Sequence, residues 1–295
     1  MSDVMITGPM LVLLLLAVSA YGDHRTSCSR GPPFGIRGLD NNVTVLDRYD
    51  CNIKKIELGA FENLPNLKTI RLHMNKIEHI DIAVFDSLPE LMSLYLNSNK
   101  LHEMPNFSEH SLPSLQELFL TSNQITVLNN SKTFAGTLQL RNLDLSFNLI
   151  EHIHPDIFKP LTNLRELYLN DNKIKFISEV TFPIQTLKKL TLDHNLIEYV
   201  SPGVFRGAKF EGLRLDFNKI SYLPANMATD FVNSGARLKS FCFCYNSWNC
   251  ACLIEQVLEV MKLGVRDYDV YWDRQLSGAK PACKFVGTSC HRETT

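Results

Sequence analysis

The apolar residues of this chain recur in one spacing, Leu-x-x-Leu-x-Leu-x-x-Asn-x-Ile/Leu, where x is any residue. Successive copies are 24, 24, 25, 24, 23 and 23 residues apart, and the last of them has Phe in place of the first Leu. The Leu-x-Leu alternation has the period of a β-strand, so it predicts a short strand in each copy with both leucines on one side. The copies begin at Leu67, Leu91, Leu115, Leu140, Leu164, Leu187 and Phe210.

Two weaker copies flank this series. Downstream, the strand pattern returns after 28 residues at Leu238. Upstream, Cys51 takes the Asn position of a degenerate copy. The apolar register of that upstream copy is kept by Val43, Leu46, Ile53 and Ile56.

One such coil cannot bury its apolar side alone, so the copies predict a stacked, curved solenoid with its parallel strands on the concave face. The recurring Asn is expected inside, where its amide satisfies backbone groups of its own and adjacent coils. A phenylalanine column closes the convex side, except in the third copy, where Phe107 falls two residues early and His110 lies near the expected position. The column consists of Phe61, Phe85, Phe134, Phe158, Phe182, Phe205 and Phe231.

Composition and charge narrow the function classes. The chain has 295 residues, of which 42 are Leu and 23 are Asn, and it is 45% hydrophobic, which suits a folded core. Its formal net charge is -1, which argues against a general nucleic-acid-binding role. No nucleophile elbow, zinc-protease motif or glycine-rich phosphate loop is present in the sequence. We therefore expect no enzyme, no cofactor and no nucleic-acid partner.

The N-terminal residues predict export. An apolar run from Met10 to Val18 is followed by the small residues Ala20 and Gly22, which indicates a signal peptide over residues 1–22. The alternative interpretation is a buried core strand. No second apolar run of spanning length follows, so we expect a secreted, extracellular protein without a membrane anchor. Three glycosylation sequons agree with this route, at Asn42, Asn106 and Asn129.

The repeats resemble the leucine-rich repeat superfamily over about residues 43 to 250. This resemblance implies an α/β solenoid, a leucine-rich repeat horseshoe with a parallel concave sheet. Its two apolar ends need caps. We expect an N-terminal cap and degenerate first repeat over 23–66, repeats over 67–246 and a cysteine-rich cap over 247–295.

Cysteines near the chain ends indicate disulfide-bonded caps. We pair Cys28 with Cys51 in the N-terminal cap. At the other end, the Asn-x-Trp-x-Cys-x-Cys segment 246–252 resembles the flank of extracellular animal leucine-rich repeat proteins. That resemblance implies a bond from Cys250 to Cys283 and one from Cys252 to Cys290, with a helix over 253–261 covering the last coil. A zinc site formed by these four cysteines is the alternative.

The C-terminal residues 277–290 are similar to secreted or surface insect leucine-rich proteins, some of which are mosquito immune proteins. Many of those proteins continue into a coiled coil, and this sequence has none. The resemblance implies a coil-less recognition protein.

The concave face offers the candidate binding residues. In each strand the residue between the last two apolar positions points away from the core. Exposed aromatics with a polar border are typical of protein-binding centres, so Tyr95, Phe119 and Tyr168 predict a partner site. The alternative is that the rings stack across strands and only stabilise the sheet. The outward residues are Arg71, Tyr95, Phe119, Asp144, Tyr168, Thr191, Arg214 and Cys242.

Cys242 and Cys244 are left over by the caps. Both are expected on the concave side of the last strand, with side chains nearly parallel, which suits a mutual disulfide poorly. An intermolecular disulfide would give a disulfide-linked dimer. A bond from one of them to the C-terminal cysteines, or two thiols, are the alternatives.

These features predict a secreted recognition module whose concave face binds a protein ligand or co-receptor, with innate immunity in insects as the setting implied by the resemblance. A structural or adhesive component of the extracellular matrix is the rival hypothesis. We expect no metal site, because the paired histidines His152 and His154 lie on a convex-side loop and are interpreted as solvated.

Overall fold

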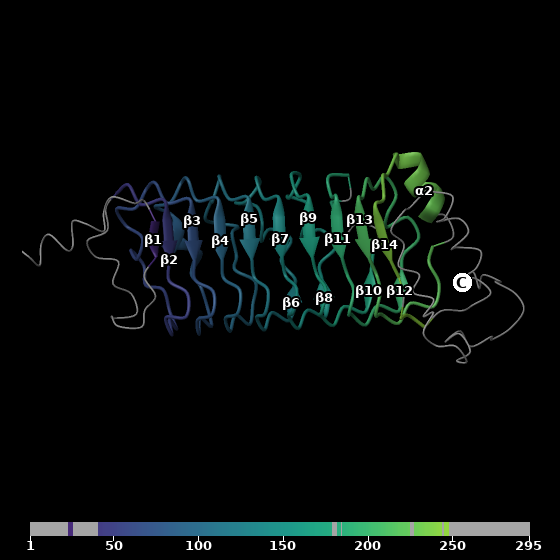
Figure 1. The fold of residues 1–295 in the computed structure, drawn as a ribbon, viewed down its shortest axis with the longest axis horizontal. Helices are drawn as coiled ribbons and strands as arrows, with labels where there is room; N and C mark the ends of the chain where they lie inside the picture. The colour runs from purple at the N-terminus through teal and green to yellow at the C-terminus, as the bar shows by residue number, and fades with distance from the viewer. Residues whose placement is uncertain are drawn as a thin grey trace, which may run out of the picture.

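The fold is a long stack of coils. The structure is a computed structural model that describes residues 23–25 and 41–247, except 179–181, 184, 225, 226 and 244. In Figure 1 the strands stand side by side along the long axis, and a return segment leads from the end of each strand to the start of the next. The predicted solenoid is confirmed.

One parallel sheet runs through the whole stack. It has ten strands, and apart from the small strands of the return segments their order follows the chain. The register aligns equivalent repeat positions, for example Leu94 with Leu118. The strands are β1 (Asp23–Arg25), β2 (Val45–Asp47), β3 (Thr69–Arg71), β4 (Ser93–Tyr95), β5 (Glu117–Phe119), β7 (Asn142–Asp144), β9 (Glu166–Tyr168), β11 (Lys189–Thr191), β13 (Gly212–Arg214) and β14 (Ser240–Cys242).

The consensus leucines form one continuous core behind this sheet. Leu143 and Leu145 flank the outward Asp144, and both are fully buried. The same arrangement recurs in the neighbouring coils, so a single apolar cluster extends from the first described coil to Phe243. Burial on both sides of each coil explains why an isolated repeat would not be stable.

The recurring Asn forms a polar ladder inside the core. Asn148 is 5% exposed. Its Oδ1 accepts from the backbone N of Ile125 at 3.0 Å, and its Nδ2 donates to the carbonyl oxygen of Leu120 at 3.0 Å and to that of Leu145 at 3.1 Å. Each Asn thus joins two coils and satisfies backbone groups that the stack would otherwise bury unpaired. The predicted role of this position is confirmed.

The first coil with a consensus register has a cysteine at the Asn position, and Asn75 of the next coil connects to its backbone. Cys51 occupies the Asn position, and its backbone N donates to Oδ1 of Asn75 at 2.9 Å. Cys51 is buried and disulfide-bonded. Its expected partner, Cys28, lies outside the described residues, so that pairing stays a prediction.

Phenylalanines pack into a second column on the convex side. Phe134 stacks on Phe158 with ring centroids 6.0 Å apart, and both are fully buried. We expected the third copy to interrupt this column, because its Phe107 falls two residues early. The column is not interrupted there, since Phe107 is also fully buried and stacks on Phe134, with ring centroids 6.4 Å apart. His110 is half-buried instead, with its Nδ1 2.9 Å from Asp86 Oδ2.

A glycine allows this coil to pack closely. A Cβ on Gly136 would lie 2.4 Å from the carbonyl oxygen of Phe107 and 2.3 Å from that of His110. The backbone of the third coil therefore approaches Gly136 more closely than any side chain allows. This approach lets Phe107 reach the phenylalanine column from its early position.

The return segments contain short elements. The 3-10 helix η1 (Ile82–Phe85) lies in one of them, and two pairs of two-residue strands form small parallel sheets. The histidine pair lies partly on one of these strands rather than on a loop, and His154 Nδ1 accepts from the backbone N of Asp156 at 3.1 Å. The pairs are β6 (Val127–Leu128) with β8 (His152–Ile153) and β10 (Phe176–Ile177) with β12 (Tyr199–Val200).

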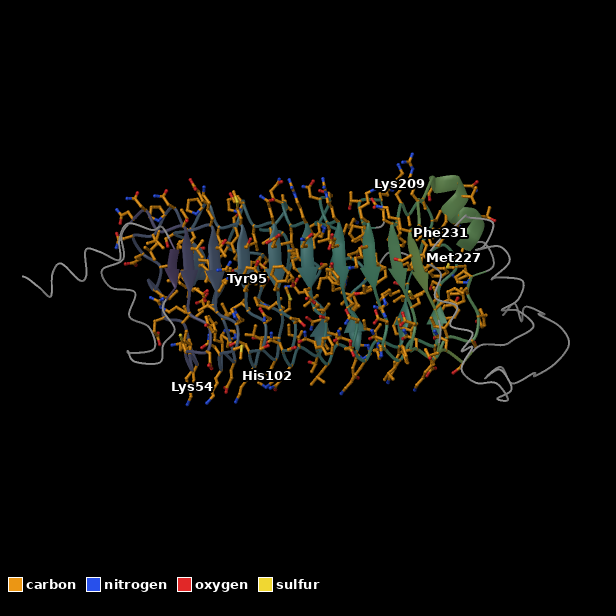
Figure 2. All side chains as sticks on the ribbon, viewed as in Figure 1. Lys54, Tyr95, His102, Lys209, Met227 and Phe231 are labelled. Atoms are coloured by element: carbon orange, nitrogen blue, oxygen red, sulfur yellow. The ribbon has the colours of Figure 1, made fainter. Side chains whose placement is uncertain are left out.

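The last described repeat is longer because it holds the helix α2 (Met227–Ser234). Met227 and Phe231 are buried, and Figure 2 shows both labels at the C-terminal end of the stack. The Phe231 ring lies 5.9 Å from that of Phe205 and so extends the convex column. Within the described part of the chain, no helix has the length and apolar character of a membrane span. The helix expected over 253–261 lies outside the described residues.

Candidate functional site

The strand register gathers the predicted binding residues into one row. Arg71 pairs with Tyr95, Tyr95 with Phe119, Phe119 with Asp144 and Asp144 with Tyr168 on successive strands. The row continues through Thr191 and Arg214 to Cys242. We call the side of the ten-stranded sheet on which these side chains lie the sheet face. Its row of residues is placed as the sequence predicted, although Thr191 is buried.

An aromatic stack occupies the N-terminal half of the sheet face. The rings of Tyr95 and Phe119 are 4.6 Å apart and inclined by 15°. The guanidinium of Arg71 lies over the Tyr95 ring, 5.7 Å from its centroid, and 3.6 Å from Asp47 Oδ2. Figure 2 shows Tyr95 in the N-terminal half of the row of strands. Both rings are half-buried, so they offer apolar surface beside a charged group.

Partial burial and charge act on the tyrosines of this row. Burial, with the nearby Glu117 carboxylate, raises the pKa of Tyr95. Burial is also the main cause of the raised pKa of Tyr168, whose hydroxyl donates to Glu166. Lys189 lies over the Tyr168 ring, with its Nζ 4.8 Å from the centroid. Both hydroxyls are therefore neutral donors at physiological pH.

Carboxylates lie between and beside these aromatics. The backbone N and the Oγ of Ser146 donate to Asp144 Oδ1 at 2.9 and 2.5 Å, and Ser93 Oγ donates to Glu117 Oε2 at 2.8 Å. Glu117 and Glu166 align with Asn142 on the strand between them. Among the ion pairs of the described coils, none involves Glu117, Asp144 or Glu166. The centre of the sheet face is therefore acidic and aromatic.

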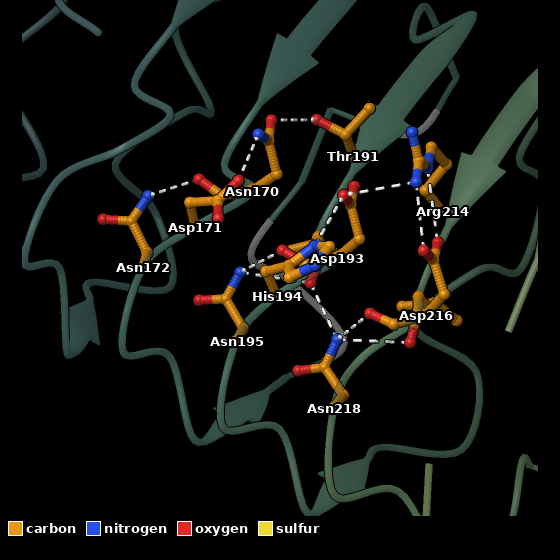
Figure 3. Close-up of polar contacts among 12 residues, drawn as sticks. Asn170, Asp171, Asn172, Thr191, Asp193, His194, Asn195, Arg214, Asp216 and Asn218 are labelled. Carbon is orange, nitrogen blue, oxygen red and sulfur yellow. Dashed lines mark hydrogen bonds and ion pairs between the residues drawn. The ribbon is translucent and has the colours of Figure 1, made fainter. Parts of the chain in front are cut away.

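In the C-terminal half of the sheet face, an arginine of the chain pairs with the carboxylates. Arg214 Nη2 lies 3.0 Å from Asp216 Oδ2 and 3.5 Å from Asp193 Oδ2, as drawn in Figure 3. Burial raises the pKa of Asp193, while Arg214 opposes that shift. The hydrogen bond to Asp216 raises the pKa of Arg214. This network was not foreseen from the sequence, although its three residues lie on or just after the adjacent strands β11 and β13.

The same network includes a set of side chains that could ligate a cation. Ligand atoms of Asp171, Asp193 and His194 lie within 4.8 Å of one another, and His194 Nδ1 is 3.3 Å from Asp193 Oδ2. Asp193 Oδ1 is buried and has no hydrogen-bond partner among the residues that the structure describes. Arg214 already supplies a positive charge next to Asp193, so we interpret the cluster as an ion-pair network. Sequence reasoning missed it because its members come from the ends of adjacent strands.

A second aromatic row lies at the edge of the sheet, where each strand turns. His194 stacks on Phe217 and Phe217 on Tyr245, with centroids 4.3 Å apart in both pairs. All three residues are exposed and have φ near +52°, in the left-handed region. The sequence signal is positional, because each residue immediately precedes a consensus Asn.

The remaining predicted sites are only partly described. The sequon residues Asn42, Asn106 and Asn129 are exposed. Cys242 is half-buried on β14 beside Arg214. The cysteines that complete the predicted caps and the leftover pair lie outside the described residues, so their bonds stay predictions: Cys28, Cys244, Cys250, Cys252, Cys283 and Cys290.

Comparisons with known proteins agree with the repeat architecture. Residues 41–101, 89–137 and 138–183 match the family model for the leucine rich repeat. Over 51 residues the chain is 45% identical to human epiphycan, and this match covers 17% of the chain and 16% of epiphycan. Mouse epiphycan gives the same identity over the same length. The chain thus spans less than a fifth of these relatives.

A solved structure shows the same architecture over a longer range. The crystal structure of a TLR13–ssRNA13 complex superimposes with a TM-score of 0.63 at 29% identity. The superposition covers 69% of this chain and 28% of that one. Together with the stacked parallel strands and the Asn ladder, these matches identify the fold of this chain as a leucine-rich repeat solenoid.

Proposed function

We propose that this protein is an extracellular recognition module that binds a protein ligand or co-receptor through its sheet face. The observation that carries the proposal is the half-exposed stack of Arg71, Tyr95 and Phe119, which lies on the side of the strands away from the core. Solenoids of this kind use their concave surfaces for binding. Tyrosine and arginine are also the side chains most enriched among interface hot spots.

The stack supports binding better than it supports a purely structural role. Cross-strand aromatic pairs contribute only about 0.2 to 1 kcal/mol to a sheet. The interior already has the leucine cluster, the Asn ladder and the phenylalanine column. A further exposed ring pair is therefore a minor source of stability and a large apolar contact area.

The extracellular setting is part of the proposal. It is supported by the signal-like residues 1–22 and by three exposed sequon asparagines. An immune role in insects is supported by the resemblance of residues 277–290 and is the narrowest part of the proposal. The rival matrix role predicts an insoluble, matrix-associated protein, whereas the recognition role predicts a protein present in body fluid and induced on infection.

The test is affinity capture from extracellular fluid, followed by measurement of the Kd of each captured protein. We expect Tyr95→Ala with Phe119→Ala to weaken a specific partner by about 2 kcal/mol or more, roughly thirtyfold in Kd. The matched control is Tyr199→Ala with Tyr222→Ala, which removes an exposed aromatic pair whose centroids are 6.4 Å apart away from the sheet face. Equal binding by the wild type and the sheet-face variant would refute the proposal.

A further inference from the structure

The row of flat side chains on the sheet face is interrupted at Asp144, and we call this interruption the gap. Arg71, Tyr95 and Phe119 stack on consecutive strands, and the next strand places Asp144 in the row. The strand after that places Tyr168 there. We infer that this gap, between Phe119 and Tyr168 and above Asp144, binds an arginine side chain of the protein ligand. This inference deepens the proposed function and rests on it.

The spacing of the strands suits a flat guest. Neighbouring strands are about 4.8 Å apart, so the strands that carry Phe119 and Tyr168 are separated by ~9.6 Å. A planar group in van der Waals contact with a ring on each side needs about 7 to 8 Å between the two rings. Asp144 is shorter than either aromatic side chain and forms the floor. The gap therefore admits one planar group, with modest tilting of the rings.

The charges of the gap favour a cation. Asp144 lies in its floor, and Glu117 and Glu166 lie beside it on the same strands as the two rings. The hydrogen bonds from Ser146 hold Oδ1 of Asp144, and its other oxygen accepts no hydrogen bond from the described residues. Lys189 lies over Tyr168, from the strand on the far side of that ring. Three carboxylates and one lysine thus lie in or beside the gap, so negative charge is in excess there.

Arginine meets these requirements better than lysine. Its guanidinium is planar, so it can stack on both rings while it donates to a carboxylate between them. The protein uses the same chemistry in its own row, where Arg71 lies over Tyr95 and approaches Asp47. At the C-terminal half, its own Arg214 lies between Asp193 and Asp216. On the central strands the row holds aromatic and acidic side chains of the same kind, Phe119, Asp144 and Tyr168, and no arginine between them.

The test uses a defined probe. The peptide acetyl-Gly-Gly-Arg-Gly-Gly-amide is titrated into the whole protein while the ring signals of Phe119 and Tyr168 are followed by NMR. The control peptide has citrulline, which keeps the planar shape and removes the charge. We expect saturable binding of the arginine peptide in the millimolar range, roughly tenfold stronger than that of the citrulline peptide.

Variants assign this binding to the gap. Asp144→Asn keeps an oxygen acceptor for Ser146 and removes the charge, so we expect it to reduce arginine selectivity roughly tenfold. Asp171→Asn is the matched control, because it removes a half-buried carboxylate outside the gap and should leave the titration unchanged. Thermal unfolding of both variants checks that the fold is intact.

Failures of the two proposals are distinguishable. Equal affinity for the arginine and citrulline peptides, or an Asp144→Asn protein that still selects arginine, would overturn the arginine gap. Capture of a partner that depends on Tyr95 and Phe119 would leave the proposed function standing in that case. Conversely, arginine selectivity that depends on Asp144, without any partner that depends on the aromatic pair, would refute only the proposed function.

Discussion

The stacked rings inside the solenoid and those on the sheet face have similar geometry and different surroundings. Phe61 and Phe85 are 5.4 Å apart and inclined by 13°, and Tyr95 and Phe119 are 4.6 Å apart and inclined by 15°. The first pair is fully buried, whereas the second is half-exposed. Stacking therefore follows from the coil repeat wherever aromatics recur. Burial and direction, rather than stacking, distinguish the buried pair from the pair that we propose for binding.

The largest expected difference is between two aromatics of adjacent coils, Phe158 and Tyr168. Phe158 is fully buried between two other rings of the convex column, so we expect Phe158→Ala to cost about 3 to 5 kcal/mol in the free energy of unfolding. Tyr168 lies on the sheet face, and Tyr168→Ala should cost about 1 kcal/mol or less. Denaturant unfolding of both variants measures this. Similar losses would mean that the sheet face is part of the structural core.

A smaller difference is expected between two asparagines that both donate to a preceding coil. Asn148→Ala should cost about 1 to 3 kcal/mol, because it leaves the N–H of Ile125 and the carbonyl of Leu120 buried and unpaired. Asn163 also donates to a carbonyl, that of Leu138 at 3.0 Å, but it is exposed. Asn163→Ala should cost a few tenths of a kcal/mol, since water replaces the bond. Equal thermal midpoints would contradict the role of the ladder.

The smallest effect concerns pH. Burial raises the pKa of Asp193 above its ordinary value of 3.8, so the folded state keeps that proton to higher pH than the unfolded state. Stability from this group therefore falls as pH rises through that window. Arg214→Gln should raise the pKa of Asp193 further and make the fall larger.

We expect the Arg214→Gln variant to be less stable than wild type by about 1 kcal/mol near neutral pH, because Arg214 is partly exposed. The deficit should shrink toward about pH 4 as Asp193 becomes protonated. Urea unfolding at both pH values measures it, with Arg141→Gln as an exposed arginine control. A deficit independent of pH would show that Arg214 acts by packing rather than by charge.

The inward half of each coil was predictable from the sequence. Leucine, Asn and Phe positions repeat because every coil meets the same neighbours, and packing tolerates few alternatives at such sites. Phe107 was the exception. Its early position is compensated by Gly136, whose missing Cβ lets the preceding coil approach. A spacing rule built from the other coils does not contain this contact.

For the outward side chains of each coil, the sequence predicted their positions on the sheet but not the contacts they make. The strand period placed Tyr95, Phe119 and Tyr168 on one face. It did not reveal that Arg214 would lie between Asp193 and Asp216, because that depends on side-chain rotamers across two adjacent strands. The position of Asp144 between Phe119 and Tyr168 also followed from this period, whereas the hydrogen bonds from Ser146 to Asp144 Oδ1 did not.

The central claim is that the aromatic pair of the sheet face serves recognition and adds little to stability. The most direct measurement compares the unfolding midpoints of two double variants, Tyr95→Ala with Phe119→Ala and Phe61→Ala with Phe85→Ala. Both remove two stacked rings from adjacent coils, and they differ in burial.

We predict that the sheet-face double variant unfolds within a few degrees of the wild type, because its rings contribute about 1 kcal/mol. The buried double variant should lose several times as much or fail to fold at all. If removal of Tyr95 and Phe119 lowers the midpoint as much as removal of Phe61 and Phe85, the pair is a structural ladder and the account is wrong.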